Sequence, residues 1–300
     1  MSVSPRLIRR RIKSIGNTRK ITKAMELVAA SKMKRSVQMT LSSRAYADTA
    51  RDIVASITHL VDPSLHPMLL GKREDAASAE KPLKTLVIAC ASDRGLCGGF
   101  NAQTIKTLHE FFLTRPQDEI SVIAVGRRAA RAIARTNYQM TAAFEALSNA
   151  PSFAAAKPIG TLAVQQFLAG TVDRVFIAYM DYKSALRQIP TVAQVLPIIP
   201  EAEITQHATT SIEGDAAILF EPSASDVLQD LLPKLVETRI YQALLESAAS
   251  EHSARMIAMR SATDNATSML EDLTLTYNQA RQASITQEIS EISAGKAAIE

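Results

Sequence analysis

Apolar residues recur at three- and four-residue steps from about Ser225 to the C-terminus. This stretch has no proline after Pro233, and its only glycine is Gly295. Because proline and glycine are the usual helix breakers, the pattern predicts one helix, roughly 100 Å long at 1.5 Å per residue. Such a helix needs a partner along its stripe. The stripe comprises Leu228, Leu231, Leu235, Ile240, Leu244, Ala248, Met256, Met259, Ala266, Met269, Leu270, Leu273, Tyr277, Ile285, Ile289 and Ile292.

A second apolar stripe lies near the N-terminus, where Gly16 is the only breaker between residues 6 and 62. Two long stripes at opposite ends of one chain predict an antiparallel coiled coil with a separate body between them. Neither stripe keeps a strict heptad, which predicts a shallow, irregular supercoil. The N-terminal stripe comprises Ile8, Ile12, Ile15, Ile21, Met25, Val28, Met33, Val37 and Leu41.

The middle of the chain has a different apolar pattern, in which short runs typical of β-strands alternate with stretches typical of helices. Strands are predicted over residues 83–91, 120–126, 174–182 and 188–199, with Pro190 confining the last one to an edge or a bend. Helices are predicted up to residue 113, over 127–135 and near 157–169. Alternating strands and helices indicate a three-layer, Rossmann-like α/β domain.

The sequence therefore predicts an α/β protein in which N- and C-terminal segments form a long antiparallel two-helix coiled coil around that central domain. The expected division is an N-terminal shaft helix (1–60), a Pro- and Gly-containing linker (61–82) and the α/β domain (83–200). A polar connecting loop (201–222) and a C-terminal shaft helix (223–300) follow.

Positive charge is concentrated at the N-terminus. The chain carries a net charge of +4, yet residues 1–35 hold eleven Lys and Arg against one acid, Glu26. The remainder is therefore net negative. A basic helix of this kind contacts an anionic partner or is a solvated polar face, and so high a concentration favours the partner.

Cysteine content and apolar run length narrow the class of protein further. Two cysteines make no disulfide framework and indicate a reducing compartment, and no uncharged apolar run approaches 18 residues. The Arg-rich first 15 residues resemble a transit peptide, but the helical stripe continues through them, which favours mature sequence.

The glycine-rich turn SDRGLCGGFN (92–101) follows a predicted strand and precedes a predicted helix, where nucleotide folds bind phosphates. It lacks the G-x-G-x-x-G pattern, and a tight structural turn explains it better. The cysteines lack metal-ligand spacing and the five histidines are scattered. We therefore expect no active site, cofactor or metal within the chain.

The stretch from Tyr277 to Ile292 is polar for a helix whose stripe is otherwise apolar. Gln282, Thr286 and Ser290 share one face at four-residue steps. The stretch is either a solvated, frayed helix end or a hydrogen-bonding surface for another protein.

Five stretches resemble one family, the gamma subunits of F-type ATP synthases. They are ITKAMELVAASKMKR (21–35), SDRGLCGGFN (92–101), IPTVAQVLP (189–197), LLESAASEHSARMIAMRSATDNA (244–266) and ARQASITQEISEI (280–292). Together they span essentially the whole chain in order.

The resemblance implies a central rotor shaft without an active site of its own. It implies that the paired helices stand inside a head of three alpha and three beta subunits, with the α/β domain bound to the epsilon subunit and the ring of c subunits. Proton flow would turn the shaft and drive ATP synthesis or hydrolysis on the beta subunits. Membrane association would come only through the complex, at the cytoplasmic face of a bacterial inner membrane.

The resemblance also implies contact residues. Met25 and Arg255 would meet where the shaft faces acidic loops of the beta subunits, with Lys20 and Lys23 nearby. That register would end the N-terminal helix opposite about residue 277, leaving a single helix that enters an apolar sleeve. The polar contact that catches beta-subunit residues at certain angles corresponds to Arg281, Gln282, Thr286 and Glu288.

The chain departs from the family at its end, SAGKAAIE, where Lys296 and Glu300 place charges in a segment that is usually small and apolar. No cysteine follows Cys97, so the thiol switch of plastid relatives is not expected.

Two other classes remain as alternatives. A nucleic-acid-binding protein with a basic helical arm predicts stacking aromatics, and residues 1–45 contain none. A small α/β enzyme with helical arms predicts a phosphate loop or a polar catalytic cluster, and neither pattern occurs.

Overall fold

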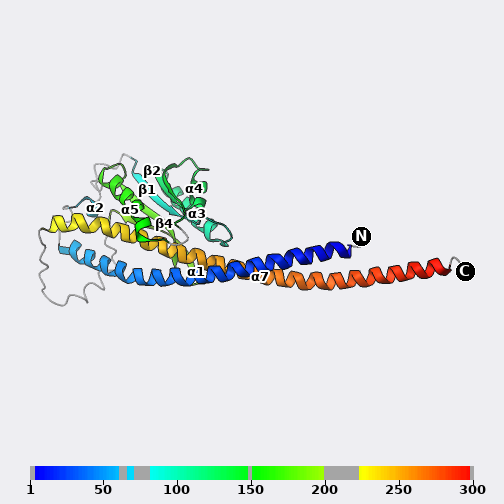
Figure 1. Cartoon of the computed structure of the whole chain (residues 1–300). Helices are drawn as coiled ribbons and strands as arrows, with labels where there is room; N and C mark the ends of the chain where they lie inside the picture. The colour runs from blue at the N-terminus through cyan, green and yellow to red at the C-terminus, as the bar shows by residue number, and fades with distance from the viewer. Residues whose placement is uncertain (1–3, 61–65, 71–81, 148–150, 199–222, 298–300) are drawn as a thin grey trace. The chain divides into compact units, whose positions relative to one another are not determined.

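The computed structural model describes residues 4–60, 66–70, 82–147, 151–198 and 223–297. It divides into two compact units: unit 1 contains residues 1–30 and 255–300, and unit 2 contains residues 31–254. The long helices α1 (Pro5–Leu60) and α7 (Ala224–Ala297) each contribute to both units (Figure 1). Most of the expected linker, apart from the short helix α2 (Pro67–Leu70), and the expected loop 201–222 lie outside the described residues. The five-part division stays a prediction.

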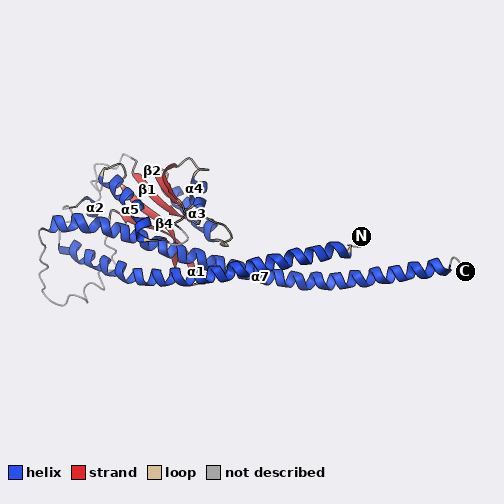
Figure 2. Ribbon diagram, viewed as in Figure 1, coloured by secondary structure: helices blue, strands red, loops and turns tan. Residues whose placement is uncertain are grey.

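Unit 2 is built on a mixed sheet, drawn as red arrows in Figure 2. Among the described residues its strands have the order β3-β2-β1-β4-β5. The central strand β1 (Lys84–Cys90) pairs in parallel with β2 (Glu119–Val125) and β4 (Arg174–Tyr182), so Ile88 lies between Ile123 and Ile177. β3 (Gln139–Phe144) is parallel to β2, and β5 (Gln188–Leu196) is antiparallel to β4 at the other edge.

Helices cover both faces of this sheet, as the alternation of side chains along β1 requires. Leu86, Ile88 and Cys90 join a core with α5 (Phe153–Leu168), α2 and the first turns of α7. Val87 and Ala89 join a second core with α3 (Phe100–Leu113) and α4 (Arg127–Ile133). The expected three-layer α/β architecture is confirmed.

Local chemistry sets the ends of these elements. Ser223 begins α7 by accepting the amide N–H of Asp226 at 3.2 Å while its hydroxyl donates to the Asp226 carboxylate at 2.7 Å. Gly126 connects β2 to α4 at φ +90°, and a Cβ there would lie 2.1 Å from the carbonyl oxygen of Ala91. Only glycine fits this close approach.

The sequence placed the four longer strands correctly and missed β3. Four of its six residues are exposed, and its alternation of apolar side chains is weak because it is an edge strand. Pro190 lies in β5 at the sheet edge, as the sequence predicted.

Candidate interaction site

The candidate site lies in unit 1, where the first turns of α1 run antiparallel to the second half of α7 (Figure 1). Each helix carries a series of buried and half-buried positions that alternates three- and four-residue steps, the spacing of a heptad seam, with further half-buried positions beside it. On α1 they are Ile8, Ile12, Ile15, Arg19, Thr22, Glu26 and Ala29. On α7 they are Met256, Met259, Thr263, Ala266, Leu270, Leu273, Tyr277 and Ala280.

This seam differs from the apolar stripe expected on α1. Ile21 and Val28 were predicted to face the partner helix, yet they are 60% and 56% exposed. Their neighbours Thr22 and Ala29 are buried instead. The prediction was wrong at these positions because the face toward α7 passes through Thr22 and Ala29, whose small side chains let the two helices approach closely there.

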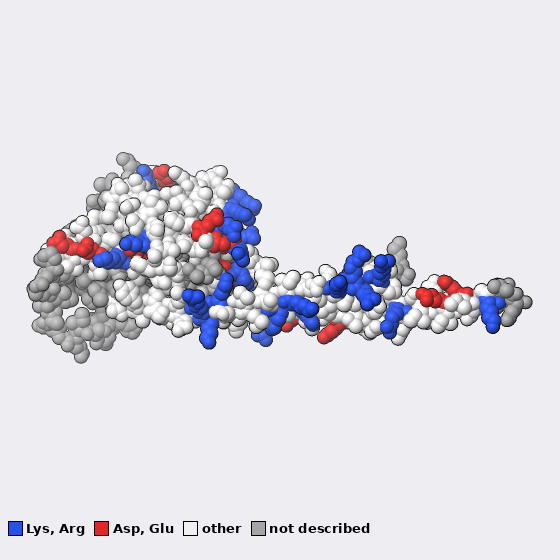
Figure 3. Space-filling model, viewed as in Figure 1, with Lys and Arg blue, Asp and Glu red and all other residues white. Residues whose placement is uncertain are grey.

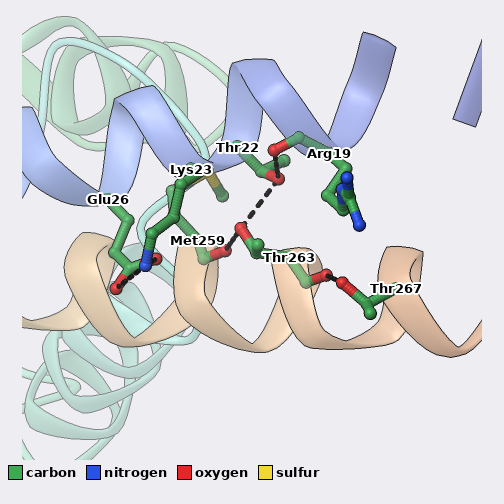
Figure 4. Close-up of polar contacts among 7 residues, drawn as sticks. All are labelled: Arg19, Thr22, Lys23, Glu26, Met259, Thr263 and Thr267. Atoms are coloured by element: carbon green, nitrogen blue, oxygen red, sulfur yellow. Dashed lines mark hydrogen bonds and ion pairs between the residues drawn. The ribbon is translucent and has the colours of Figure 1, made fainter. Parts of the chain in front are cut away.

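Two hydroxyl groups meet across the seam. The Oγ1 atoms of Thr22 and Thr263 lie 2.8 Å apart (Figure 4). Each is also near a carbonyl oxygen of its own helix, that of Arg19 at 3.1 Å and that of Met259 at 2.8 Å. Since each hydroxyl carries one proton, one of them donates within its helix and the other donates across the seam. The pair fixes the register of the two helices.

The basic positions expected to contact a partner lie beside this seam. Lys20 and Lys23 are exposed, and the Nζ atom of Lys23 is 3.1 Å from a carboxylate oxygen of Glu26. Met25 and Arg255 are both half-buried. Because Thr22 faces Thr263, Met25 lies opposite about residue 260, roughly 7 Å along the helix from Arg255.

The four polar residues expected near the end of α7 are all exposed, but they do not share one face. At about 100° per residue, Arg281 and Glu288 lie on one line along the helix, and Gln282 and Thr286 lie on another. The Oε1 atom of Glu288 is 3.4 Å from the hydroxyl of Ser284.

An exposed apolar stripe fills the space between those two polar lines. Ile285, Ile289 and Ile292 are 48%, 58% and 73% exposed. Their helical angles fall between the Arg281 line and the Gln282 line, well away from the seam positions Tyr277 and Ala280. The sequence included these isoleucines in one continuous stripe, whereas the structure gives them a separate direction. This end of α7 therefore offers an apolar strip with polar edges.

Charge is distributed unevenly along unit 1. Lys and Arg side chains gather on the N-terminal half of α1 (Figure 3), where Arg6, Arg9, Arg10, Arg11 and Lys13 are exposed. Acidic side chains gather near the end of α7, which carries Glu288 and Glu291. A cationic surface of this density attracts acidic partners over a Debye length.

Polar groups of the glycine-rich turn before α3 form hydrogen bonds with one another. The hydroxyl of Ser92 donates to the carbonyl oxygen of Arg94 at 2.6 Å, and its amide N–H donates to the Asn101 side chain at 3.0 Å. Asn101 also donates to the sulfur of Cys97 at 3.0 Å. These bonds account for the polar residues of the motif as parts of a structural turn.

Few groups in the described residues are arranged for metal binding or as reactive nucleophiles. No three His, Cys, Asp or Glu side chains lie together in a way that could hold a metal ion, considering the described part of the chain. Both cysteines are buried, and burial raises the pKa of the Cys90 thiol to about 12. None of the described helices is long and apolar enough to cross a bilayer.

Comparison with known proteins matches one family over nearly the whole chain. A family model described as ATP synthase matches residues 4–299. The ATP synthase gamma chain of Opitutus terrae is 43% identical over 302 residues, covering 98% of each chain. That of Brevibacillus brevis is also 43% identical, over 300 residues and 98% of each chain. Nothing in these matches supports nucleic-acid binding.

Solved structures share the fold. The rotor of the Euglena gracilis mitochondrial ATP synthase, in rotational state 1, aligns with 94% of this chain and 98% of its own at a TM-score of 0.61 and 20% identity. The central stalk and c-ring structure from Tetrahymena thermophila aligns with 81% of this chain and 99% of its own at a TM-score of 0.59 and 24% identity. Two long helices together with an α/β domain are thus the fold of an ATP synthase central stalk. The chain belongs to the ATP synthase gamma-chain family.

Proposed function

We propose that this chain is the central rotor shaft of a membrane-associated ATP synthase. Rotation of the shaft inside the catalytic head couples proton flow through the membrane ring to ATP synthesis or hydrolysis. The observation that carries the proposal is similarity to ATP synthase gamma chains at 43% identity over 98% of the chain.

The geometry of unit 1 supports a shaft. A helix pair with a heptad seam is stiffer than one helix, and the hydroxyl pair at Thr22 and Thr263 resists sliding of one helix along the other. α1 begins at Pro5, which the register places opposite about residue 280 of α7. The described part of α7 beyond that point extends as a single helix with the Ile285–Ile292 strip exposed.

The proposed partners are three alpha and three beta subunits around the helix pair, with the epsilon subunit and the c ring on the α/β domain. The chain itself makes and breaks no bond and holds no cofactor. ATP chemistry belongs to the head, and this subunit changes the conformation of the head as it turns. The proposed location is the cytoplasmic face of a bacterial inner membrane, reached through the complex.

Two groups of residues are the proposed contacts with the beta subunits. Lys20, Lys23, Met25 and Arg255 face acidic loops where the shaft enters the head. Farther along, Arg281, Gln282, Thr286 and Glu288 line both edges of the exposed isoleucine strip. An apolar strip can slide in an apolar sleeve, while polar edges provide hydrogen bonds at particular angles.

Co-expression with the cognate alpha and beta subunits tests the proposal. We expect a complex with three alpha, three beta and one copy of this chain on size exclusion, with ATPase activity that requires this chain. Elution of the chain alone, with alpha and beta unchanged by its presence, would overturn the proposal.

A further inference from the structure

Four arginines form an exposed surface on unit 2, at α4 and the turn after it. Arg127, Arg128, Arg131 and Arg135 are all exposed, whereas Ala129 and Ile133 are each 2% exposed and fasten the helix to the sheet. Residues 126–137 contain no acidic residue. We call these four residues the α4 arginine face. In Figure 3 blue side chains gather over the α4 region of the α/β domain, with a group of red side chains beside them.

The α4 arginine face is poorly neutralised by the chain itself. Arg127 approaches Glu145 only at 4.0 Å, and that carboxylate is 61% exposed. Among the described residues, no carboxylate lies within 4 Å of Arg131 or Arg135. Like charges four residues apart on a helix repel each other. The arrangement therefore works against the stability of the isolated chain.

Two other exposed lysines on the same unit are paired. The Nζ atom of Lys106 lies 3.7 Å from Glu110, and that of Lys183 lies 2.9 Å from Asp181. The α4 arginine face differs from them because it gathers four arginines within residues 127–135, a stretch without an acidic residue. It also stands out because the chain beyond residue 35 is net negative.

The face is held in a fixed position next to an exposed apolar side chain. The amide N–H of Arg127 donates to the Asp93 carboxylate at 3.1 Å, and that of Arg128 donates to the Ser92 carbonyl at 3.0 Å. Between these anchors and α3, Leu96 is 62% exposed and has φ +64°. A non-glycine residue in this conformation requires support from its surroundings. The loop and α4 therefore present arginines and one leucine on a common rigid support.

We infer that the α4 arginine face, with Leu96 beside it, docks an Asp- and Glu-rich protein surface on another subunit of the complex. This inference rests on the proposed function, which supplies protein partners. All four cations are arginines, whose planar guanidinium groups bind carboxylates with two parallel hydrogen bonds.

Lipid and nucleic acid fit this surface less well. The helix exposes no large apolar side chain for insertion into a bilayer, since its remaining residues are alanines and the buried Ile133. The nearest aromatic in sequence, Tyr138, packs its ring 4.3 Å from that of Phe112 and is not available to stack on bases.

Charge reversal at two positions tests the inference. The variant R131E/R135E is compared with the matched control K157E/K234E, which changes the same net charge at exposed lysines of α5 and α7. Affinities of the full-length chain for the alpha–beta head, for epsilon and for the c ring are measured at low and high salt. We expect R131E/R135E to weaken binding to one of these partners by about tenfold or more at low salt. The difference should shrink at high salt, because counterions screen exposed charges.

Folding is monitored in parallel. The carboxylate introduced by R131E would lie four residues from Arg127, so the thermal unfolding midpoint of the reversed variant should equal or exceed that of wild type. A second variant, R131Q/R135Q, removes charge without reversing it and should show a smaller loss of affinity.

The outcomes separate the two proposals. A wild-type chain that joins none of these partners overturns the proposed function and this inference with it. A wild-type chain that assembles while R131E/R135E binds every partner as tightly as K157E/K234E does overturns the inference alone. Selective loss of binding to anionic vesicles or duplex DNA, with protein assembly unchanged, also overturns it.

Discussion

At the scale of single residues, small side chains on α1 are buried while large apolar ones beside them on the same helix are exposed. Ala29 is 1% exposed and Thr40 is 1% exposed, while Leu27 is 60% and Leu41 58% exposed. Small side chains allow close approach between helices, and large ones are left for other contacts. The same principle operates at Gly160, where an added Cβ would lie 2.8 Å from the Glu237 side chain.

The Thr22–Thr263 pair gives the first prediction. Thr263→Val leaves the Thr22 hydroxyl with its own carbonyl partner and should lower the free energy of unfolding by about 1 kcal/mol. The double variant T22V/T263V replaces both hydroxyls with methyl groups in a buried seam and should be near neutral or stabilising. Chemical denaturation of wild type, Thr263→Val, Thr22→Val and the double variant measures this. A double variant that loses the sum of two single losses would contradict a coupled pair.

Cys90 gives a prediction about pH. A thiol with a pKa of about 12 is ionised to about one part in ten thousand at pH 8. Since the thiolate is the reactive form and the sulfur is buried, alkylation of Cys90 in the native protein should be negligible from about pH 7 to 9. Mass spectrometry after iodoacetamide treatment measures it, with the denatured protein as the positive control. Rapid native labelling of Cys90 at about pH 8 would show that the strand opens.

At the scale of elements, α7 changes its role along its length. Its first turns bury Leu228, Leu232 and Val236 against the sheet. Its middle holds polar groups, with Glu246 accepting from Arg44 of α1 at 2.7 Å and from Gln242 at 3.0 Å. Its last turns expose the isoleucine strip. One helix thus serves as a core element, a buried polar seam and a contact surface.

The Arg44–Glu246 pair should stabilise the packing of α1 on α7 within unit 2. Arg44→Met leaves the Glu246 carboxylate, whose side chain is 8% exposed, with less compensation. Because the arginine itself is 37% exposed and water reaches it, we expect a loss of about 2 kcal/mol, less than for a fully buried pair.

The matched control for that substitution is Lys106→Met, which breaks a pair whose side chains are 77% and 59% exposed. Its expected loss is below about 0.5 kcal/mol. Denaturant titrations of both variants give the comparison. Equal losses would mean that Glu246 is not desolvated in solution.

The polar edges of the isoleucine strip give a functional prediction. R281A/Q282A should lower coupled ATP synthesis in the assembled complex severalfold while leaving the fold intact, because one residue from each polar line is lost. The control Q287A/E291A removes a hydrogen-bonded pair, 2.9 Å apart, from another face of the same turns. Membrane vesicles driven by a proton gradient provide the measurement. Equal synthesis by both variants would exclude Arg281 and Gln282 from coupling.

At the scale of the whole molecule, burial decreases from the sheet to the end of α7. β1 is almost entirely inaccessible, whereas residues 285–296 of α7 are all exposed. Local opening is easiest where few apolar contacts must break. Different parts of one continuous helix should therefore differ greatly in protection.

Hydrogen exchange of the isolated full-length chain measures this gradient. We expect amides of β1 and of α7 between residues 228 and 250 to exchange slowest, and those of residues 285–296 to exchange fastest among the α7 amides. Assembly with the head should slow exchange at residues 285–296. Uniform protection along α7 in the isolated chain would contradict the gradient.

Periodicity determined much of this protein, namely two long helices and an α/β domain between them, and no proline after Pro233 interrupts the second helix. These features are local, since each residue's spacing to its neighbours carries the information. The edge strand β3 was missed because its local pattern of apolar residues is weak.

Only the tertiary structure decided which face of each helix is buried. Ile21 and Thr22 are neighbours in sequence, and a rotation of about 100° exchanges their positions. The choice depends on what the opposite helix offers, here Thr263 and Ala266. In the same way, only the fold separated the isoleucine strip from the seam and revealed the α4 arginine face as a surface with little acidic compensation. The sequence by itself determined the elements and the family, while packing between distant segments determined the surfaces.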